Sequence, residues 1–173
     1  MERGMSRPIR LEFPGASYHV TARGNERRAI FKDHADRAMF VTTLAEAVQG
    51  HGLAVQAWCL MGNHYHLLLD TPLGNLRRGM GWLQTTYTIR FNRRWRRSGH
   101  LFQGRYKAHL VDADAYAQEL VRYVHLDPVR PADKTAAVPE ERLETLCNYF
   151  WSSHRVYAGL EAAPPWLAAN WLA

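Results

Sequence analysis

The first quarter of the chain has a strand pattern followed by a helix pattern. Residues 16–22 read A-S-Y-H-V-T-A, which is rich in β-favouring residues and precedes a turn at residues 23–25. Apolar side chains then recur at helical spacing over residues 34–49, directly after Asp33, a residue type that caps helix N-termini. We therefore expect a strand and then a helix that stops at Gly50.

The middle of the chain is predicted to form a hairpin and a second helix. Two short apolar segments, residues 53–60 and 64–70, are separated by Met-Gly-Asn at 61–63, which is turn chemistry between antiparallel strands. Asn75 then opens a helix that runs to Trp95, with apolar residues on one side and arginines near its C-terminal end.

The last core elements are a strand and a helix. Residues 106–111 predict the strand, and residues 115–126 predict the helix, capped by Asp112 or Asp114. Pro128 should end this helix, because the residue before a proline is pushed away from helical geometry. The complete order is βαββαβ followed by a helix.

This order is that of the ferredoxin-like fold, an α+β architecture in which two helices cover one face of an antiparallel four-stranded sheet. The length of 173 residues suits one domain with a modest extension. We assign residues 1–131 to the main domain and residues 132–173 to a helical C-terminal extension that packs on or beside it. Because this fold hosts many unrelated activities, function has to be argued from particular residues.

The positive charge of the chain lies in its middle. Lys and Arg number 22 against 16 Asp and Glu, for a net charge of +6. Between Asp70 and Asp112 there are nine positive residues and no acid, and we call residues 71–111 the basic segment. Arginine neutralises phosphate, and the interleaved aromatic rings could stack on unpaired bases, although some must belong to the core. Those rings are Phe91, Trp95, Phe102 and Tyr106. The combination favours binding of single-stranded or hairpin nucleic acid over a merely solvated helix face.

Several other classes of protein are disfavoured. No apolar segment approaches the roughly 20 residues needed to span a bilayer, and residues 1–10 lack the hydrophobic part of a signal peptide. Cys59 and Cys147 have no C-x-x-C spacing, so we expect free thiols rather than a disulfide framework. The expectation is a cytoplasmic protein with no membrane partner.

The sharpest local pattern is G-N-H-Y-H-L-L-L at residues 62–69. Alternate side chains of a strand share a face, so His64 and His66 project together while Tyr65 projects away. Two adjacent imidazoles can hold a metal ion. For an arbitrary H-x-H pair, one packed and one solvated histidine is the commoner arrangement.

Tyr123 and Asp127 lie four residues apart and therefore on one face of the last predicted helix. Asp127 could offer an oxygen as a third metal ligand, and Tyr123 could offer a hydroxyl nucleophile to phosphorus. The alternative is a core tyrosine and a helix-capping aspartate. Four further histidines could join a metal site, although each is more often a packed or surface residue. They are His19, His100, His109 and His125.

Six motifs, in order along nearly the whole chain, resemble the single-tyrosine HUH transposases, and most closely their REP-associated tyrosine transposase branch. They are P-G-A-S-Y-H-V-T-A-R-G-N (14–25), C-L-M-G-N-H-Y-H-L-L-L (59–69), F-N-R-R (91–94), G-H-L-F-Q-G-R-Y-K (99–107), R-Y-V-H-L-D-P-V-R (122–130) and W-S-S-H-R-V-Y (151–157). Several separated motifs in the right order are far more specific than an H-x-H pair.

The resemblance implies that His64 and His66 hold magnesium or manganese and that Tyr123 is the nucleophile. Attack on single-stranded DNA, typically a repeat that folds into a hairpin, would leave a 5′-phosphotyrosine and a free 3′-hydroxyl. The R-G-N turn and the basic segment would hold this DNA. The residues expected to bind it are Arg23, Asn25, Arg90, Arg93, Arg94, Arg96, Arg97, Arg105 and Lys107.

The sequence departs from the family at Asp127, a position that is more often Gln or Asn in these proteins. A carboxylate would bind a hard divalent ion more tightly, and Asp127 is the expected third ligand, with helix capping as the alternative. The favoured function is a metal-dependent DNA nickase and strand transferase. A non-catalytic nucleic-acid binder or repressor, and a metal phosphodiesterase in which water attacks, stay open. We expect a monomer or a homodimer.

Overall fold

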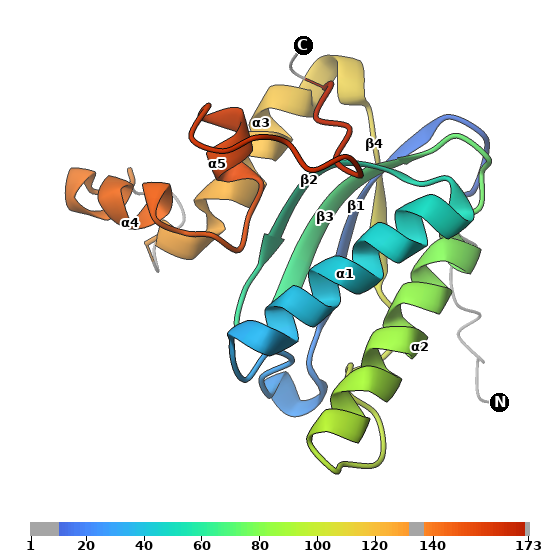
Figure 1. Ribbon diagram of the computed structural model, residues 1–173. Helices are drawn as coiled ribbons and strands as arrows, with labels where there is room; N and C mark the ends of the chain where they lie inside the picture. Colours follow the sequence, from blue (N-terminus) through green and yellow to red (C-terminus); the bar gives the residue numbers. More distant parts are fainter. Residues whose placement is uncertain (1–10, 132–136, 172–173) are drawn as a thin grey trace, which may run out of the picture.

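The computed structural model describes residues 11–131 and 137–171. They form an antiparallel four-stranded sheet in the order β2-β3-β1-β4, with helices on both faces (Figure 1). The strands are β1 Ala16–Arg23, β2 Ala54–Leu60, β3 His64–Thr71 and β4 Lys107–Val111. Helices α1 (His34–His51) and α2 (Leu76–Arg94) cover one face, and α3 (Ala113–Leu126) lies on the other. The predicted ferredoxin-like fold is confirmed.

Side-chain alternation divides strand β3 between the two faces of the sheet. Tyr65 and Leu67 pack with α1 and α2, whereas Leu68 packs with residues of α3. His64 and His66 share the face of Leu68, because residues two apart on a strand point the same way. The packing of one face therefore determines which face presents the imidazoles.

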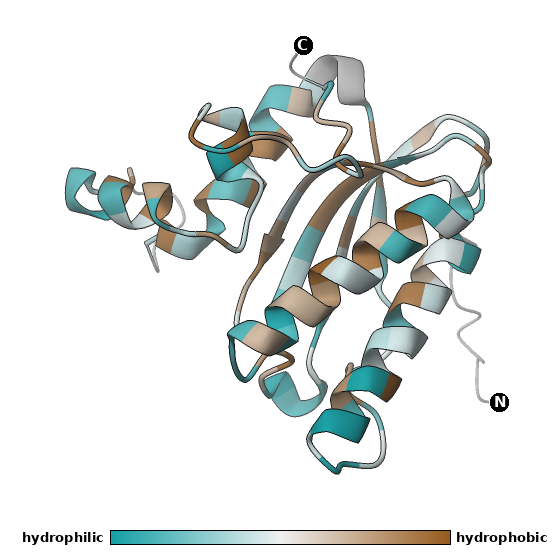
Figure 2. Cartoon of the chain, viewed as in Figure 1, coloured by the Kyte–Doolittle hydropathy of each residue, from teal (hydrophilic) through white to brown (hydrophobic). Residues whose placement is uncertain are grey.

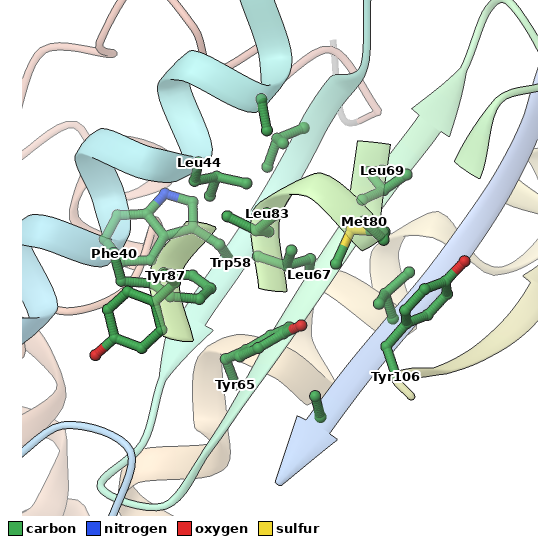
Figure 3. Close-up of a cluster of buried hydrophobic side chains, with 14 of the residues drawn as sticks. Phe40, Leu44, Trp58, Tyr65, Leu67, Leu69, Met80, Leu83, Tyr87 and Tyr106 are labelled. Atoms are coloured by element: carbon green, nitrogen blue, oxygen red, sulfur yellow. The ribbon is translucent and has the colours of Figure 1, made fainter. Parts of the chain in front are cut away.

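The main core lies between β3 and the helices α1 and α2 (Figure 3). Phe40 of α1 is at its centre, with ring centroids 4.9 Å from Tyr65 and 5.0 Å from Tyr87 of α2. All three side chains are fully buried. Burying a large apolar side chain contributes about 1.5–3 kcal/mol, so this face anchors β3 firmly and leaves the opposite face free for polar chemistry.

The aromatic rings of the basic segment also belong to this core. Phe91, Phe102 and Tyr106 are buried, and Trp95 is partly buried against the same cluster. The indole N–H of Trp95 donates to Asp36 at 3.0 Å. The partners of these rings are thus core side chains, so they are not available as stacking platforms for bases.

Ion pairs join α1 to α2. Arg94 lies 2.6 Å from the buried Asp36 and 2.6 Å from Asp33, which is the N-cap of α1 as predicted. Arg90 pairs with Glu46 at 2.8 Å. Asp36 is fully buried, so removing Arg94 would leave this carboxylate buried without its cationic partner. Arg94 therefore has a structural role in the helix layer.

One helix boundary differs from expectation. α1 continues through Gly50 and ends at His51, because Gly52 takes the left-handed conformation, with φ of 62°, and donates its N–H to the carbonyl of Val48. α2 begins after Asn75 as predicted, but the Asn75 side chain donates to the carbonyl of His51 at 2.7 Å instead of capping its own helix. These contacts tie the end of α1 to the start of α2.

The segment after α3 packs along the outer edge of β2 (Figure 1). It contains two short helices, α4 (Leu143–Cys147) and α5 (His154–Tyr157), and is otherwise largely irregular. The backbone N–H of Ser153 donates to the carbonyl of Trp58 at 2.9 Å. Hydrogen bonds of this kind satisfy a strand edge that would otherwise be open to pairing with another chain.

His125 joins α3 to this C-terminal segment. Its Nε2 lies 2.8 Å from Oγ of Ser153, and its side chain is buried. Burial, helped by the charge of His154, lowers the pKa of His125 to about 3. Because Tyr123 is only two residues earlier on α3, this contact also helps to hold Tyr123 over the sheet.

Two further expectations concern thiols and membranes. Both cysteines are free, with Cys59 buried and Cys147 exposed, as predicted. Burial raises the pKa of the Cys59 thiol. In the described parts of the chain, no helix is long and apolar enough to cross a membrane.

The neutral, buried state of His125 predicts a pH-dependent stability. The unfolded chain takes up a proton on this residue near the ordinary pKa of 6.5, whereas the folded protein does so only near pH 3. The contribution of His125 to the free energy of unfolding is therefore complete above pH 6.5 and should fall by about 1.4 kcal/mol per pH unit below it. Urea unfolding at neutral and acidic pH measures this. His125→Gln, which does not titrate, should show a shallower decline, and parallel declines would contradict the assignment.

Candidate active site

The two histidines of β3 and an aspartate after α3 converge on one point. Nε2 of His64 lies 3.1 Å from Oδ2 of Asp127, and Nε2 of His66 lies 3.6 Å from the same atom. Asp127 is the first residue of a 3-10 helix, Asp127–Val129, that follows α3 directly. The chain therefore stays helical, with a tighter turn, through Pro128. Within the part of the chain that the structure describes, these three residues form the one candidate metal cluster, with ligand atoms all within 4.8 Å of one another.

Asn63 fixes the orientation of His64. Its Nδ2 donates to the backbone carbonyl of Arg27 at 2.9 Å, which determines the direction of the amide. Its Oδ1 then accepts a hydrogen bond from Nδ1 of His64 at 2.7 Å. The Nδ1 atom of His64 is therefore protonated, and Nε2 is directed toward Asp127. Metal-binding histidines commonly have such a partner on the second ring nitrogen.

His19 of β1 holds His66 in the same way. Its Nε2 lies 2.9 Å from Nδ1 of His66, and the two rings stack with centroids 5.1 Å apart. Burial, and to a smaller extent the charge of His109, lowers the pKa of His19 to about 4. Burial likewise lowers the pKa of His66 to about 4. Both rings are neutral at neutral pH, which is the form of imidazole that binds a metal.

The carboxylate of Asp127 is stabilised as an anion. Burial alone would raise its pKa, but the hydrogen bond with His64 and the charges of His66 and Arg130 bring the pKa below its ordinary value. Two imidazole nitrogens and one carboxylate oxygen form a donor set that suits a divalent cation. The residues present therefore fit a metal ion.

Tyr123 of α3 lies beside this cluster. Its ring makes edge contacts with the rings of His19 and His66, with centroids 5.9 and 6.0 Å apart. The guanidinium carbon of Arg130 lies 3.9 Å from the centroid of the Tyr123 ring, and Nη2 of Arg130 donates to the Tyr123 carbonyl at 2.9 Å. Tyr123 shares a pocket of about 480 Å³ with the three members of the metal cluster, which we call the site pocket. A potential nucleophile and a potential metal site therefore lie in the same pocket.

One protein-family model matches most of the folded chain, including all three residues of the candidate metal cluster. The family described as IS200-like transposases matches residues 13–127, which include both histidines of β3, Tyr123 and Asp127. The chain belongs to this family. No curated protein sequence matches it. Transposases process DNA, so the site pocket of this transposase is a candidate for DNA chemistry.

Solved structures show that the fold is shared more widely. A REP-associated tyrosine transposase bound to a REP hairpin is 17% identical, with a TM-score of 0.66 over 98% of this chain and 94% of that one. The tRNA(His) guanylyltransferase of Saccharomyces cerevisiae is 11% identical, with a TM-score of 0.50 over 84% and 76%. A putative transposase from Deinococcus radiodurans is 21% identical, with a TM-score of 0.45 over 79% and 100%. The likenesses to the REP-associated transposase and the guanylyltransferase concern the fold alone, which unrelated activities share.

Three residues expected to bind DNA line the site pocket of the transposase: Arg23, Arg105 and Lys107. Arg23 ends β1 and Lys107 begins β4, so the two neighbouring strands bring these cations together. Asn25 is exposed in the turn after β1, and its backbone N–H donates to the carbonyl of Leu101 at 2.9 Å.

The arginines of α2 are divided between two environments. Arg90 and Arg94 are held by acidic residues of α1, on the face of the sheet opposite the site pocket. Arg93, Arg96 and Arg97 lie at the C-terminal end of α2 and in the loop that follows, where the ribbon in Figure 2 has the colour of hydrophilic residues. The sequence shows only a uniformly positive segment, so it could not distinguish the paired arginines from those at the end of α2.

Three supporting residues were not given these roles from the sequence: His19, Asn63 and Arg130. Each of them lies inside one of the six motifs, and that position was the available signal. His19 is 47 residues from His66 and meets it only through strand register. The other histidines do not contact the cluster as ligands: His109 faces His19 across β1 and β4, His125 is buried on α3, and His100 is exposed.

The contact between His19 and His66 predicts an effect on metal affinity. We expect His19→Phe to raise the dissociation constant for Mn²⁺ about 10–100-fold, the usual cost of losing an outer partner of a ligand histidine. His19→Gln, which restores an acceptor, should recover part of the affinity. His109→Phe is the matched control, because His109 is a neighbouring imidazole without a bond to a ligand. Calorimetry or Mn²⁺ paramagnetic resonance gives the constants, and equal affinity of the two Phe variants would rule the role out.

Proposed function

We propose that this transposase cleaves and rejoins single-stranded DNA with Tyr123 as its catalytic nucleophile. The observation that supports this most directly is that Tyr123 shares the site pocket with His64, His66 and Asp127. A repressor that only binds DNA has no need of a phenol beside a cluster of potential metal ligands.

The reaction exchanges one phosphodiester bond for another. The Tyr123 oxygen attacks a backbone phosphorus, the bond from that phosphorus to the 3′ oxygen breaks, and a 5′-phosphotyrosine and a free 3′-hydroxyl result. The phenol proton is released to solvent as the new bond forms, and the departing 3′ oxygen takes up a proton. Because the number of phosphodiester bonds is unchanged, rejoining by the reverse route needs no nucleotide cofactor.

His64, His66 and Asp127 are the proposed ligands of magnesium or manganese. When bound, the divalent ion supplies Lewis-acid polarisation of the scissile phosphate. Asn63 and His19 hold the two imidazoles so that their Nε2 atoms face Asp127. The carboxylate of Asp127 strengthens binding of a hard cation.

Four cationic residues act on the nucleophile and the phosphates. Arg130 lies over the face of the Tyr123 ring and hydrogen-bonds to its backbone, so it restricts the ring to one orientation. Arg23, Arg105 and Lys107 neutralise the charge of phosphates that enter the site pocket.

The proposed substrate is a DNA repeat that folds into a hairpin, as in the REP-associated branch of the family. The structurally similar REP-associated transposase is bound to a REP hairpin, and the exposed cations beyond the site pocket could hold such a structure. Those at the end of α2 are Arg93, Arg96 and Arg97, and the polar Asn25 lies in the turn after β1. Arg90 and Arg94, which were also expected to bind DNA, are instead engaged by Glu46, Asp33 and Asp36. We propose that the protein acts on cellular DNA in the cytoplasm, as a monomer or a homodimer.

Tyr123→Phe should abolish cleavage and the covalent protein–DNA adduct while preserving DNA affinity, because it removes the nucleophilic oxygen and little packing. The substrate is a panel of single-stranded hairpins taken from DNA that flanks the gene, incubated with Mn²⁺ and resolved by denaturing electrophoresis. Tyr116→Phe is the matched control, since Tyr116 is an exposed tyrosine of the same helix, and it should form the adduct normally. Cleavage by Tyr123→Phe without an adduct would instead indicate attack by water.

Asp127 should tune metal binding more than it enables the reaction. Asp127→Asn keeps an oxygen ligand but removes a charge, so we expect a severalfold higher Mn²⁺ concentration for half-maximal cleavage, with substantial activity at saturation. Asp127→Ala should lose more, because no oxygen remains. If both variants keep the metal dependence of the unmodified protein, Asp127 is not a ligand.

A further inference from the structure

A second concavity lies on the other side of β4 from the site pocket. This groove, of about 1030 Å³, runs between α2 and β4 and is called here the α2–β4 groove. β4 is the outer strand of the sheet, and Ile89 of α2 is an uncovered apolar side chain beside it. Leu11, Ile89 and Leu110 at the groove are 67%, 60% and 49% exposed. Exposed apolar side chains gathered at a concave surface commonly mark a binding site.

The chemistry of the α2–β4 groove is that of a single-strand binding surface. No acidic residue lines it, in the described part of the chain, and its charged members are Arg105 and Lys107. Thr88 of α2 and His100 add hydrogen-bonding groups. Surfaces that bind single strands combine cations for the phosphates with side chains, most often aromatic, on which the bases pack. In this groove the exposed aliphatic side chains of Ile89 and Leu110 offer the apolar contact.

The groove is continuous with the site pocket. Gly104, Arg105 and Lys107 line both concavities. Register explains how β4 serves both: Lys107 pairs with Thr21 on the site face, whereas Leu110 pairs with Tyr18, which is buried on the helix face. A strand of DNA that leaves the site pocket past these two cations therefore enters the groove.

We propose that the α2–β4 groove binds the single-stranded DNA that adjoins the scissile phosphate. The bases lie against Ile89 and Leu110, and the phosphates at the mouth of the groove are held by Arg105 and Lys107. The inference rests on the proposed function, because it extends the path of the same substrate beyond the site pocket.

Other occupants match the groove less well. A duplex keeps its bases stacked and presents phosphates to a protein surface. Beyond Arg105 and Lys107 at its mouth, however, the groove exposes the apolar side chains of Ile89, Leu110 and Leu11. A second copy of the chain pairing along the free edge of β4 is the remaining competitor, and the experiment below separates it from DNA.

The test compares two substitutions that each replace an exposed helical aliphatic residue by glutamate. Ile89→Glu places a negative charge in the groove, and Leu143→Glu in α4, where Leu143 is 44% exposed, is the control. Binding is measured by fluorescence anisotropy without metal, using oligothymidylates of about 5 and about 15 nucleotides, within the range of single-strand site sizes. Ile89→Glu should weaken binding of the longer probe roughly tenfold, the effect of losing one base contact, and should leave the shorter probe unaffected.

A second measurement locates the probe. The longer oligothymidylate, carrying bromodeoxyuridine, should photocrosslink to peptides from α2 and β4. Equal binding by the two glutamate variants, or crosslinks confined to other peptides, would overturn the proposal. So would a dimer of the unmodified protein that Ile89→Glu converts to a monomer, which would assign the groove to contact between copies.

Failure of this inference is distinguishable from failure of the proposed function. Suppose that the unmodified protein and Ile89→Glu form the Tyr123 adduct equally well and bind the probes equally well. This result would contradict the proposed role of the groove and would support Tyr123 as the nucleophile. Crosslinks to the groove without any adduct would support DNA binding in the groove and would contradict the proposed chemistry at Tyr123.

Discussion

The alternation of side chains along β3 is the constraint on which the rest of the site depends. Tyr65 and Leu67 are fully buried against α1 and α2, so the strand cannot slip by one residue without exposing its whole apolar side. The same register holds His64 and His66 on the opposite face. The free energy of core packing, rather than any local interaction between the histidines, therefore determines where a cation can bind.

The metal cluster is also coupled to the surface around it. Asn63 connects His64 to the turn after β1, in which Glu26 and Arg27 have φ angles of 53° and 58°. A non-glycine residue at positive φ costs free energy that the surrounding structure must offset. The hydrogen bond that Asn63 donates to the Arg27 carbonyl offsets part of this cost. A contact made by DNA with the turn would thus be transmitted to a ligand histidine through a single amide.

Positive charge serves two different purposes in this protein. Arg94 lies between two acidic residues and stabilises the helix layer, whereas Arg23, Arg105 and Lys107 line the site pocket. Arg130 lies over the ring of Tyr123, the proposed nucleophile. The net charge of +6 is therefore a poor guide to which cations meet phosphate. Whether a given arginine or lysine is free to meet phosphate depends on its partners on neighbouring elements, such as the acids of α1.

Local patterns in the sequence determined most of the fold and the centre of the site. The periodicities of 2 and 3.6 depend on a few neighbouring residues, and for that reason they correctly predicted the four strands, both covering helices and the shared face of His64 and His66. The spacing of four residues likewise brought Tyr123 and Asp127 to the same pocket, although Asp127 lies in the 3-10 turn that follows α3 rather than on the helix itself. The stop of α1 was misplaced by two residues, because either Gly50 or Gly52 could adopt the left-handed conformation and only the contacts at the helix end select one.

What the tertiary structure decided are relations between residues far apart in the chain. The hydrogen bond between His19 and His66 arises from the pairing of β1 with β3, and no pattern within either strand encodes it. The separation of paired from exposed arginines depends on acids of α1, some 40 to 60 residues earlier. The α2–β4 groove exists because β4 joins the sheet beyond the cover of α2. Each is a consequence of packing distant segments together, which sequence periodicity does not specify.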